Sequence, residues 1–165
     1  MAFEIERKFL VRGEAWRGLA TSKVRIRQGY LSPEGKASIR VRIKDDHEAA
    51  VTFKSRTPER RRLELEYPVP VLEAEALIAL RRGSIIEKER YLVPHAGETW
   101  EVDVFEGENA GLVIAELELR DEHQHVDLPP WVGAEVTGQA PYYNSALALH
   151  PFATWPRDKM HALGL

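Results

Sequence analysis

Cysteine is absent from the 165-residue sequence, which excludes disulfides, thiol nucleophiles and metal sites built on thiolates. Long apolar runs are absent as well, because none approaches the ~20 residues that a membrane-spanning helix requires. The charged N-terminal segment is unlike a secretory signal peptide. From these absences we expect a cytoplasmic protein that has no membrane partner.

An excess of positive charge is also missing. The formal net charge is −3, and the sequence carries no polybasic tail. Proteins that bind nucleic acid usually present clustered Lys and Arg to the phosphate backbone. We therefore expect no nucleic-acid partner.

What the sequence does contain is typical of one folded domain. A chain of this length can bury most of its unfolded surface in a single core. Hydrophobic residues make up 44% and charged residues 30%, as in soluble globular proteins. No internal repeat or long linker divides the sequence, so we expect a single domain over residues 1–165.

Charged residues recur at every second position in several segments. Side chains of a strand alternate between its two faces, so residues two apart share a face. Near the start of the chain, Glu4, Glu6 and Lys8 would share one face, opposite Ile5 and Phe9. Seven segments carry such sets: Glu4, Glu6 and Lys8; Arg40, Arg42 and Lys44; Lys54 and Arg56; Glu64 and Glu66; Lys88 and Arg90; Glu101 and Asp103; Glu116, Glu118 and Arg120.

Eight segments have the pattern of strands: residues 3–11, 24–31, 37–43, 49–55, 64–69, 85–93, 99–105 and 112–120. Eight mainly antiparallel strands are enough to close a ring. With one face aliphatic and the other charged, the pattern favours a barrel whose charges point into a water-filled interior. The alternative is an open sheet whose charged face meets bulk water. We predict an α+β, mainly β fold: an eight-stranded antiparallel closed β-barrel, or tunnel, with a charged polar interior and helices packed outside.

The clearest helix signal follows Pro70. We expect Arg81 and Arg82 in its last turn and Gly83 just beyond, which suits the helix dipole and the capping preferences. Its apolar stripe would consist of Leu72, Ala76, Ala79 and Leu80. Shorter helices are expected at residues 13–20, 131–136, 144–149 and 158–163.

The charges predicted to line the barrel are of both signs. The cations are Lys8, Arg40, Arg42, Lys54, Lys88 and Arg90. The anions are Glu4, Glu6, Glu64, Glu66, Asp103, Glu116 and Glu118. Buried charges need partners, and salt bridges within the barrel could satisfy them. Arg and Lys clusters also suit phosphate, whereas carboxylates without softer ligands suit Mg²⁺ or Mn²⁺. Both classes together indicate a site for a polyanion with divalent metals.

These residues resemble the signature of the CYTH superfamily of triphosphate tunnel metalloenzymes, and the chain is most similar to its small bacterial inorganic triphosphatases. The similarity starts with the Glu-x-Glu-x-Lys opening and extends to about residue 144. Its further motifs are Gln28-Gly-Tyr30-Leu31, Arg40-x-Arg42, Thr52-Phe-Lys54, Glu64-x-Glu66-Tyr67, Lys88-x-Arg90-Tyr91, Trp100-x-Val-Asp103-x-Phe105, Ala115-Glu116-x-Glu118-Leu119 and Tyr142-Tyr143-Asn144. The resemblance implies metal-dependent hydrolysis of inorganic tripolyphosphate to pyrophosphate and phosphate.

The resemblance also implies roles for single residues. Phosphate would be bound by Lys8, Arg40, Arg42, Lys54, Lys88 and Arg90. Two Mg²⁺ or Mn²⁺ ions would be held, one by Glu4, Glu6 and Glu116 and the second by Glu64, Asp103 and Glu118, with Glu66 a weaker candidate. The candidate catalytic residues are Asp103 and Glu118, which would orient the attacking water, and Lys8, which would assist proton transfer.

Other functions stay open at this point. The same fold could cyclise ATP to cyclic AMP, hydrolyse thiamine or nucleoside triphosphates, or bind polyphosphate without turnover. Residues 60–62 are expected to form a solvated loop or a basic flap near the tunnel mouth. The oligomeric state is also open, with a homodimer as one option.

Overall fold

The computed structural model describes residues 3–32, 34–56 and 61–156, of which residue 61 is described by its backbone alone. Nine antiparallel strands form its sheet: β1 (Phe3–Val11), β2 (Ser22–Ser32), β3 (Ala37–Lys44), β4 (Glu48–Ser55), β5 (Arg61–Val69), β6 (Arg82–His95), β7 (Glu98–Phe105), β8 (Val113–Glu118) and β9 (Val132–Glu135). Two α-helices, α1 (Val71–Ala79) and α2 (Asn144–Leu149), accompany them. Short 3₁₀ turns are η1 (Ala15–Leu19), η2 (Gly107–Asn109), η3 (Ala140–Tyr142) and η4 (Phe152–Thr154).

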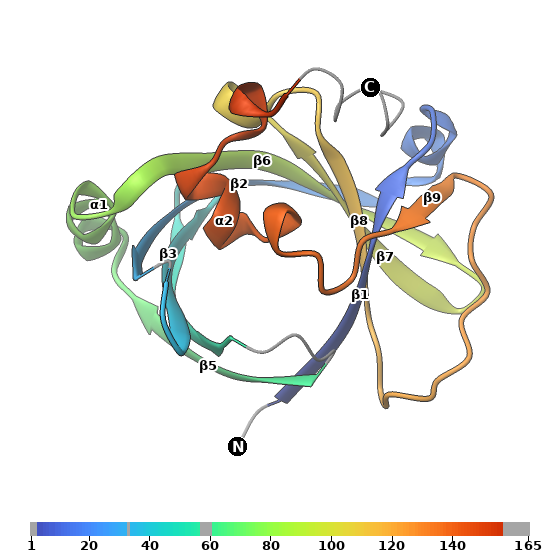
Figure 1. Cartoon of the computed structure of the whole chain (residues 1–165), viewed down its shortest axis with the longest axis horizontal. Helices are drawn as coiled ribbons and strands as arrows, with labels where there is room; N and C mark the ends of the chain where they lie inside the picture. Colours follow the sequence, from blue (N-terminus) through green and yellow to red (C-terminus); the bar gives the residue numbers. More distant parts are fainter. Residues whose placement is uncertain (1–2, 33, 57–60, 157–165) are drawn as a thin grey trace.

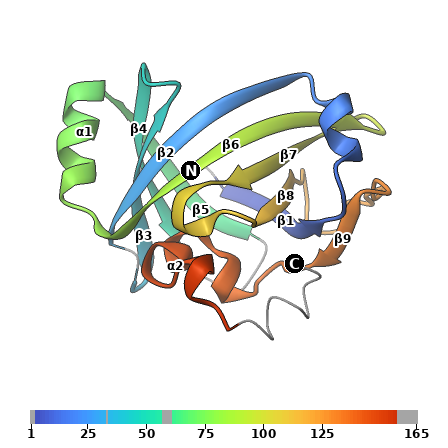
Figure 2. The ribbon, with the colours of Figure 1, turned by 90° about the horizontal axis from the view of Figure 1, so that it is seen from above.

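Eight strands close into a ring, as predicted (Figure 1). Their order is β5-β4-β3-β2-β6-β7-β8-β1, and pairing of β1 with β5 completes the barrel. The long strand β1 makes this possible because residues 3–5 pair with β5 while residues 6–10 pair with β8 on the other edge. Figure 2 shows the same wall from the side, with the strands strongly tilted.

The extra strand β9 lies outside the ring, where a short helix was expected over residues 131–136. That prediction is wrong. Strand β1 extends past β5, and β9 pairs with the free edge there, with Phe9 opposite Glu135 and Val11 opposite Val132. The backbone groups of β1 that would otherwise lack partners explain why this segment is extended.

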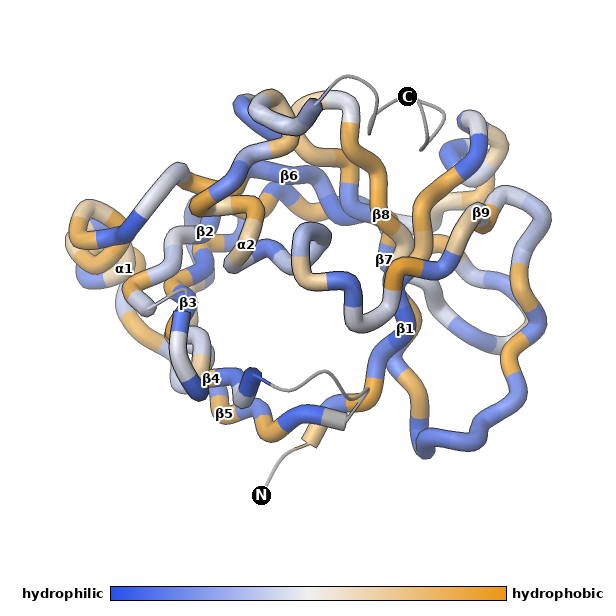
Figure 3. The backbone as a smooth tube through the Cα atoms, in the orientation of Figure 1, coloured by the Kyte–Doolittle hydropathy of each residue, from blue (hydrophilic) through white to orange (hydrophobic). Residues whose placement is uncertain are grey.

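The alternating sequence pattern places the charges as predicted. In neighbouring strands Lys8 lies opposite Glu116, and Lys54 lies opposite Glu64, so these side chains share the inner face. Hydrophilic and hydrophobic residues alternate along much of the barrel wall (Figure 3). The outward-facing Val41 and Ile43 of β3 give helix α1 an apolar surface to cover, whereas the outer faces of β2 and β6 carry ion pairs such as Lys23 with Glu89.

Helix α1 covers one part of the outer face. Its buried residues Ala74 and Ile78 pack on Val41 and Ile43 of β3. The predicted stripe is wrong, since the side chain of Leu72 is 86% exposed. The helix is also shorter than expected: it ends at Ala79, and Arg82 already belongs to β6. The packing of the helix against the sheet selected a different face from the one that apolar residues alone suggested.

A second outer cluster covers β1, β7 and β8. It is built around Trp16 of η1, Phe9, Trp100 and Trp131. Phe9 and Trp131 both make edge-to-face contacts with Trp100, with ring centroids 5.5 and 5.7 Å apart. This cluster fixes the outer side of the strands that carry most of the inner carboxylates.

Helix α2 lies across one end of the barrel rather than on its outside (Figures 1 and 2). Leu147, Ala148 and Phe152 pack against inward-facing residues such as Ile86 and Phe105. The prediction that helices pack outside therefore holds for α1 and not for α2. One end of the interior is an apolar core, and the charged cavity occupies the rest. The expected helix at residues 158–163 lies outside the described residues.

Candidate active site

A cavity inside the barrel is lined by polar side chains from most of its strands. The cations around it are Lys8, Arg40, Arg42, Lys44, Lys54, Arg56, Arg62, Lys88 and Arg90. The carboxylates are Glu4, Glu6, Glu64, Glu66, Glu101, Glu116 and Glu118. The structure therefore brings the predicted phosphate-binding residues together with the predicted metal ligands, with Asp103 as the exception.

One side of the cavity is acidic because β1 and β8 lie side by side. Glu6 lies opposite Glu118, and Glu116 lies two residues before Glu118 in β8. Burial and then the charge of Glu116 raise the pKa of Glu6. Burial, followed by the charges of Glu4 and Glu6, raises the pKa of Glu118. Crowded carboxylates of this kind are stabilised by a cation.

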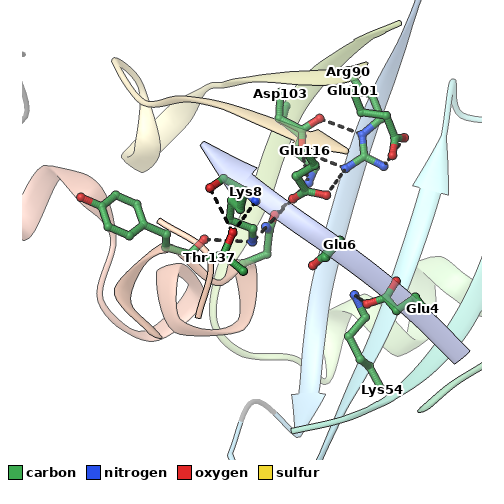
Figure 4. A network of polar contacts seen from close by, with 12 residues as sticks. Glu4, Glu6, Lys8, Lys54, Arg90, Glu101, Asp103, Glu116 and Thr137 are labelled. Atoms are coloured by element: carbon green, nitrogen blue, oxygen red, sulfur yellow. Dashed lines mark hydrogen bonds and ion pairs between the residues drawn. The ribbon is translucent and has the colours of Figure 1, made fainter. Parts of the chain in front are cut away.

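Nearby cations hold some of these acids (Figure 4). The Nζ atom of Lys8 lies 3.5 Å from Oε1 of Glu116, and Nη2 of Arg90 lies 3.7 Å from Oε2. Burial alone would raise the pKa of Glu116, but Lys8 and Arg90 lower it to about 2. Lys54 similarly places its Nζ 2.7 Å from Oε1 of Glu4. The acidic side is thus ionised at neutral pH, at least at Glu116.

Asp103 lies behind the cavity wall instead of lining it. Its side chain is 0% exposed, and Oδ1 accepts a hydrogen bond of 2.7 Å from Nε of Arg90. Oδ2 accepts from Nη2 of Arg90 at 2.9 Å and lies 2.8 Å from Nζ of Lys88. Burial opposes ionisation, but Arg90 and Lys88 prevail and hold the pKa of Asp103 well below its usual range. This geometry makes Asp103 the residue that fixes two of the predicted phosphate ligands.

Lys88 is the most deeply buried of the cations that line the cavity, at 1% exposed. Its Nζ also donates a hydrogen bond of 2.9 Å to Oδ1 of Asn144, at the start of α2. Burial lowers the pKa of Lys88 to about 7, although Asp103 opposes the shift. An anion bound beside Lys88 would therefore stabilise its charged form.

Two arginines of β3 have no ionic partner among the described residues. Arg42 donates from Nε to Oε1 of Gln28 at 2.9 Å, and Arg40 donates from Nη2 to Oγ1 of Thr52 at 3.2 Å. Burial, and then the charges of Arg40 and Arg90, lower the pKa of Arg42. The Nε atom of Arg40 is buried without a hydrogen-bond partner. Buried cations without an anionic partner are suited to bind a polyanion such as a chain of phosphates.

The acidic side has the chemistry of a site for a hard divalent metal. Within the described residues, no three His, Asp or Glu side chains already converge as a metal site. The donors are all carboxylate oxygens, however, and burial together with neighbouring carboxylates raises the pKa values of Glu6 and Glu118. Hard cations with oxygen ligands, such as Mg²⁺ and Mn²⁺, fit this chemistry. Binding would draw Glu4 and Glu116 away from their lysine partners.

Several cavity residues were missed from the sequence. Arg62 belongs to β5 and is buried, so the loop or flap expected at residues 60–62 is wrong for this residue, whereas residue 60 lies outside the described residues. The alternation of charges in the sequence could have placed Arg62 in the cavity, because it stands two residues before Glu64. The same holds for Arg56, which stands two residues after Lys54. Tyr143 and Asn144 carried no signal of this kind, because their position depends on how the C-terminal part folds back into the barrel.

The chain is similar to known proteins over nearly its whole length. The family model described as CYTH domain matches residues 2–146. An inorganic triphosphatase of Acetivibrio thermocellus is 47% identical over 153 residues, covering 92% of this chain and 97% of that protein. An inorganic triphosphatase of Nitrosomonas europaea is 38% identical over 151 residues, covering 88% and 97%. The crystal structure of the inorganic triphosphatase NE1496 aligns with a TM-score of 0.65 at 36% identity, covering 90% of this chain and 96% of that chain.

Proposed function

The chain belongs to the CYTH family, and on that premise we propose that it is a divalent-metal-dependent inorganic triphosphatase. Its substrate would be tripolyphosphate, bound in the barrel cavity and hydrolysed to pyrophosphate and phosphate. Two relatives named inorganic triphosphatase support this assignment, and the match covers 97% of the length of each. The cytoplasmic location and a homodimer stay predictions.

The observation that carries the proposal is the unpaired positive charge inside the barrel. Arg40 and Arg42 face the cavity and form no ion pair with a described carboxylate. A purely structural barrel would gain by replacing such cations with apolar residues. A chain of phosphates supplies several anionic oxygens to Arg40, Arg42 and the neighbouring Lys88 at once, and Arg can hold two oxygens together.

The acidic side would hold the metals. We propose that Glu4, Glu6 and Glu116 bind one Mg²⁺ or Mn²⁺, and that Glu64 and Glu118 contribute to a second. Such an ion supplies a Lewis acid that neutralises charge on phosphoryl oxygens. Asp103 has both oxygens engaged by Arg90 and Lys88, so we assign it the positioning of those cations rather than direct ligation.

The remaining chemistry falls to two side chains near the acidic side. Glu118 is more exposed than Glu116 and has a raised pKa, so it is suited to accept a proton from the attacking water. Lys8, next to Glu116, would donate a hydrogen bond to the oxygen of the departing pyrophosphate. Among the described residues, neither helix has the length and apolar character of a membrane span.

A substrate panel tests the assignment. Phosphate release from tripolyphosphate, thiamine triphosphate and ATP is measured with Mg²⁺, Mn²⁺ or Ca²⁺ and with EDTA, beside cyclic AMP formation from ATP. We expect tripolyphosphate with Mg²⁺ or Mn²⁺ to be the preferred pair, and Glu4→Gln and Lys8→Ala to lose activity. Dominant cyclic AMP formation would identify a cyclase, and binding without turnover would identify a polyphosphate-binding module.

A further inference from the structure

Two arginines that line the cavity are not used by the proposed function. Arg56 follows the last residue of β4, and Arg62 is the second residue of β5. Lys54 lies opposite Glu64 in this hairpin, so continuing the register by two residues sets Arg56 opposite Arg62. Both line the cavity. Arg56 lies two residues after Lys54 and Arg62 two residues before Glu64, a separation of about 6.6 Å along each strand.

Neither arginine has a carboxylate partner of its own among the described residues. Arg56 forms no ion pair with any carboxylate in the described part of the chain. For Arg62 the partner is Oε1 of Glu6, which lies 3.9 Å from Nη1. Glu6 also interacts with Lys54 and Lys8, so its single charge is shared among three cations. Counted over the described residues, these two opposed guanidinium groups therefore have more positive charge than the neighbouring carboxylates balance.

Each of the two side chains also has a buried nitrogen that donates no hydrogen bond. Nη2 of Arg56 and Nε of Arg62 are buried and have no hydrogen-bond partner. Arg62 is only 8% exposed, so water does not readily replace the missing acceptor. Buried donors are nearly always satisfied in folded proteins, and an exception calls for a ligand or another reason.

The two groups are nevertheless held in place. Arg56 donates from Nε to the Gly35 carbonyl oxygen at 2.9 Å and from Nη1 to Oγ of Ser145 at 3.3 Å. The guanidinium of Arg62 stacks on the ring of Tyr143, 4.6 Å from its centroid. Fixing the side chains in advance reduces the entropy that a ligand would have to overcome.

We propose that Arg56 and Arg62 form a further phosphate subsite, which takes the additional phosphate of a linear polyphosphate longer than tripolyphosphate. The other cations of the cavity would hold three phosphates, and the chain would continue past Lys54 to these two arginines. The inference rests on the proposed function for the identity of the ligand as a polyphosphate. It extends that function by predicting selection for chain length.

Calorimetric titration with tripolyphosphate and linear tetrapolyphosphate in EDTA tests the subsite without turnover. For the wild type we expect tetrapolyphosphate to bind about tenfold more tightly, the scale of one charge-assisted contact. Arg56→Gln combined with Arg62→Gln should bring the two affinities within about twofold of each other. Arg62→Lys, which keeps the charge but not the planar fork, should retain part of the difference.

Arg25→Gln is the matched control, because Arg25 lies on the outside of β2 and pairs with Glu106. It should keep the wild-type ratio of affinities. A wild-type protein without preference for tetrapolyphosphate, or a double variant that keeps the preference, would overturn the subsite. Melting temperatures of the variants show whether each one is folded. If Mg²⁺ supports no hydrolysis of either chain, the proposed function fails, while the ratio in EDTA still decides the subsite.

Discussion

Both faces of the barrel wall carry cations and carboxylates, but two cations of the inner face lack an ion-pair partner among the described residues. On the outside of β2 and β6, cations meet carboxylates: Arg25 lies 2.8 Å from Glu106, and Lys23 lies 3.7 Å from Glu89. On the inside, Arg40 and Arg42 have no such partner among the described residues. Outer pairs are exposed to water and are therefore worth little to stability.

The difference shows that cations without an ion pair, rather than the number of charges, separate the site from the surface. Other inner cations do pair with carboxylates: Lys8, Lys54, Lys88 and Arg90. Inside, a buried cation without a partner costs stability, and we infer that it is retained because it binds the substrate. Substitutions on the inner face should therefore change binding and catalysis strongly. Substitutions on the outer face should change little.

The largest effect is expected for Glu116→Gln on the inner face. The change removes a proposed metal ligand and leaves Lys8 and Arg90 without one of their counter-charges. We expect kcat for tripolyphosphate to fall by at least about 10²-fold, on the scale of losing one electrostatic contributor. Steady-state phosphate release with saturating Mg²⁺ measures it, and a loss below tenfold would contradict the assignment.

Asp103→Asn should be nearly as damaging, but for a different reason. It leaves the buried Lys88 and Arg90 without their shared carboxylate. Breaking a buried pair in this way costs about 3–5 kcal/mol of unfolding free energy. Urea unfolding measures the loss, and titration with Mn²⁺ of the folded variant separates the two roles. An unchanged stability with abolished Mn²⁺ binding would restore Asp103 as a direct ligand.

Arg40→Met should separate stability from function. No described carboxylate loses a partner, and a buried donor without an acceptor is removed. We expect the free energy of unfolding to rise by about 1 kcal/mol, while KM for tripolyphosphate rises at least tenfold. Paired measurements of denaturation and kinetics check both. A destabilised protein with normal KM would show that Arg40 has a structural role.

A moderate effect is expected from pH. Burial and neighbouring carboxylates raise the pKa values of Glu6 and Glu118 above the usual 4.5 of glutamate. Protons therefore compete for the proposed metal ligands at a higher pH than for an isolated Glu, and apparent Mg²⁺ affinity should fall as the pH drops toward those values. Activity should be recovered at acidic pH by excess Mg²⁺. An Mg²⁺ requirement that is constant between pH 5 and about 8 would argue against these ligands.

The smallest effect is expected for Arg25→Gln on the outer face. Its guanidinium pairs with Glu106 and Glu87 in water, where such pairs contribute about 0–1 kcal/mol. Activity should stay within about twofold of the wild type, and stability within about 0.5 kcal/mol. A larger loss of activity would mean that the outer face takes part in function.

The sequence was sufficient to predict the faces of the strands and the closed barrel. Alternation is local, so Glu4, Glu6 and Lys8 could be assigned to the inner face before any pairing was known. Closure was also anticipated, from the number of strands. Which residues pair to complete the ring, such as Phe3 with Leu63, is a property of distant segments that no local pattern contains.

The errors share this non-local cause. The segment at residues 131–136 became β9 because β1 offers it a free edge. Helix α1 turned Ala74 and Ile78 to the sheet, and Leu72 stayed exposed. In the site, the depth of Asp103 follows from the strands around it, and Tyr143 reaches the cavity only because the C-terminal part folds into one end of the barrel. Arg62 does fit the alternation of inward-facing charges, but it belongs to a run of arginines at residues 60–62 that we interpreted as a loop.

The most direct test is a crystal structure of the protein soaked with tripolyphosphate and Ca²⁺, a hard cation with oxygen ligands like Mg²⁺. Our account predicts the phosphate chain inside the barrel, within hydrogen-bond distance of Arg40 and Arg42, with metal density beside Glu6 and Glu118. A cavity without phosphate at saturating tripolyphosphate, or a chain bound to the outer face of β2 and β6, would contradict it.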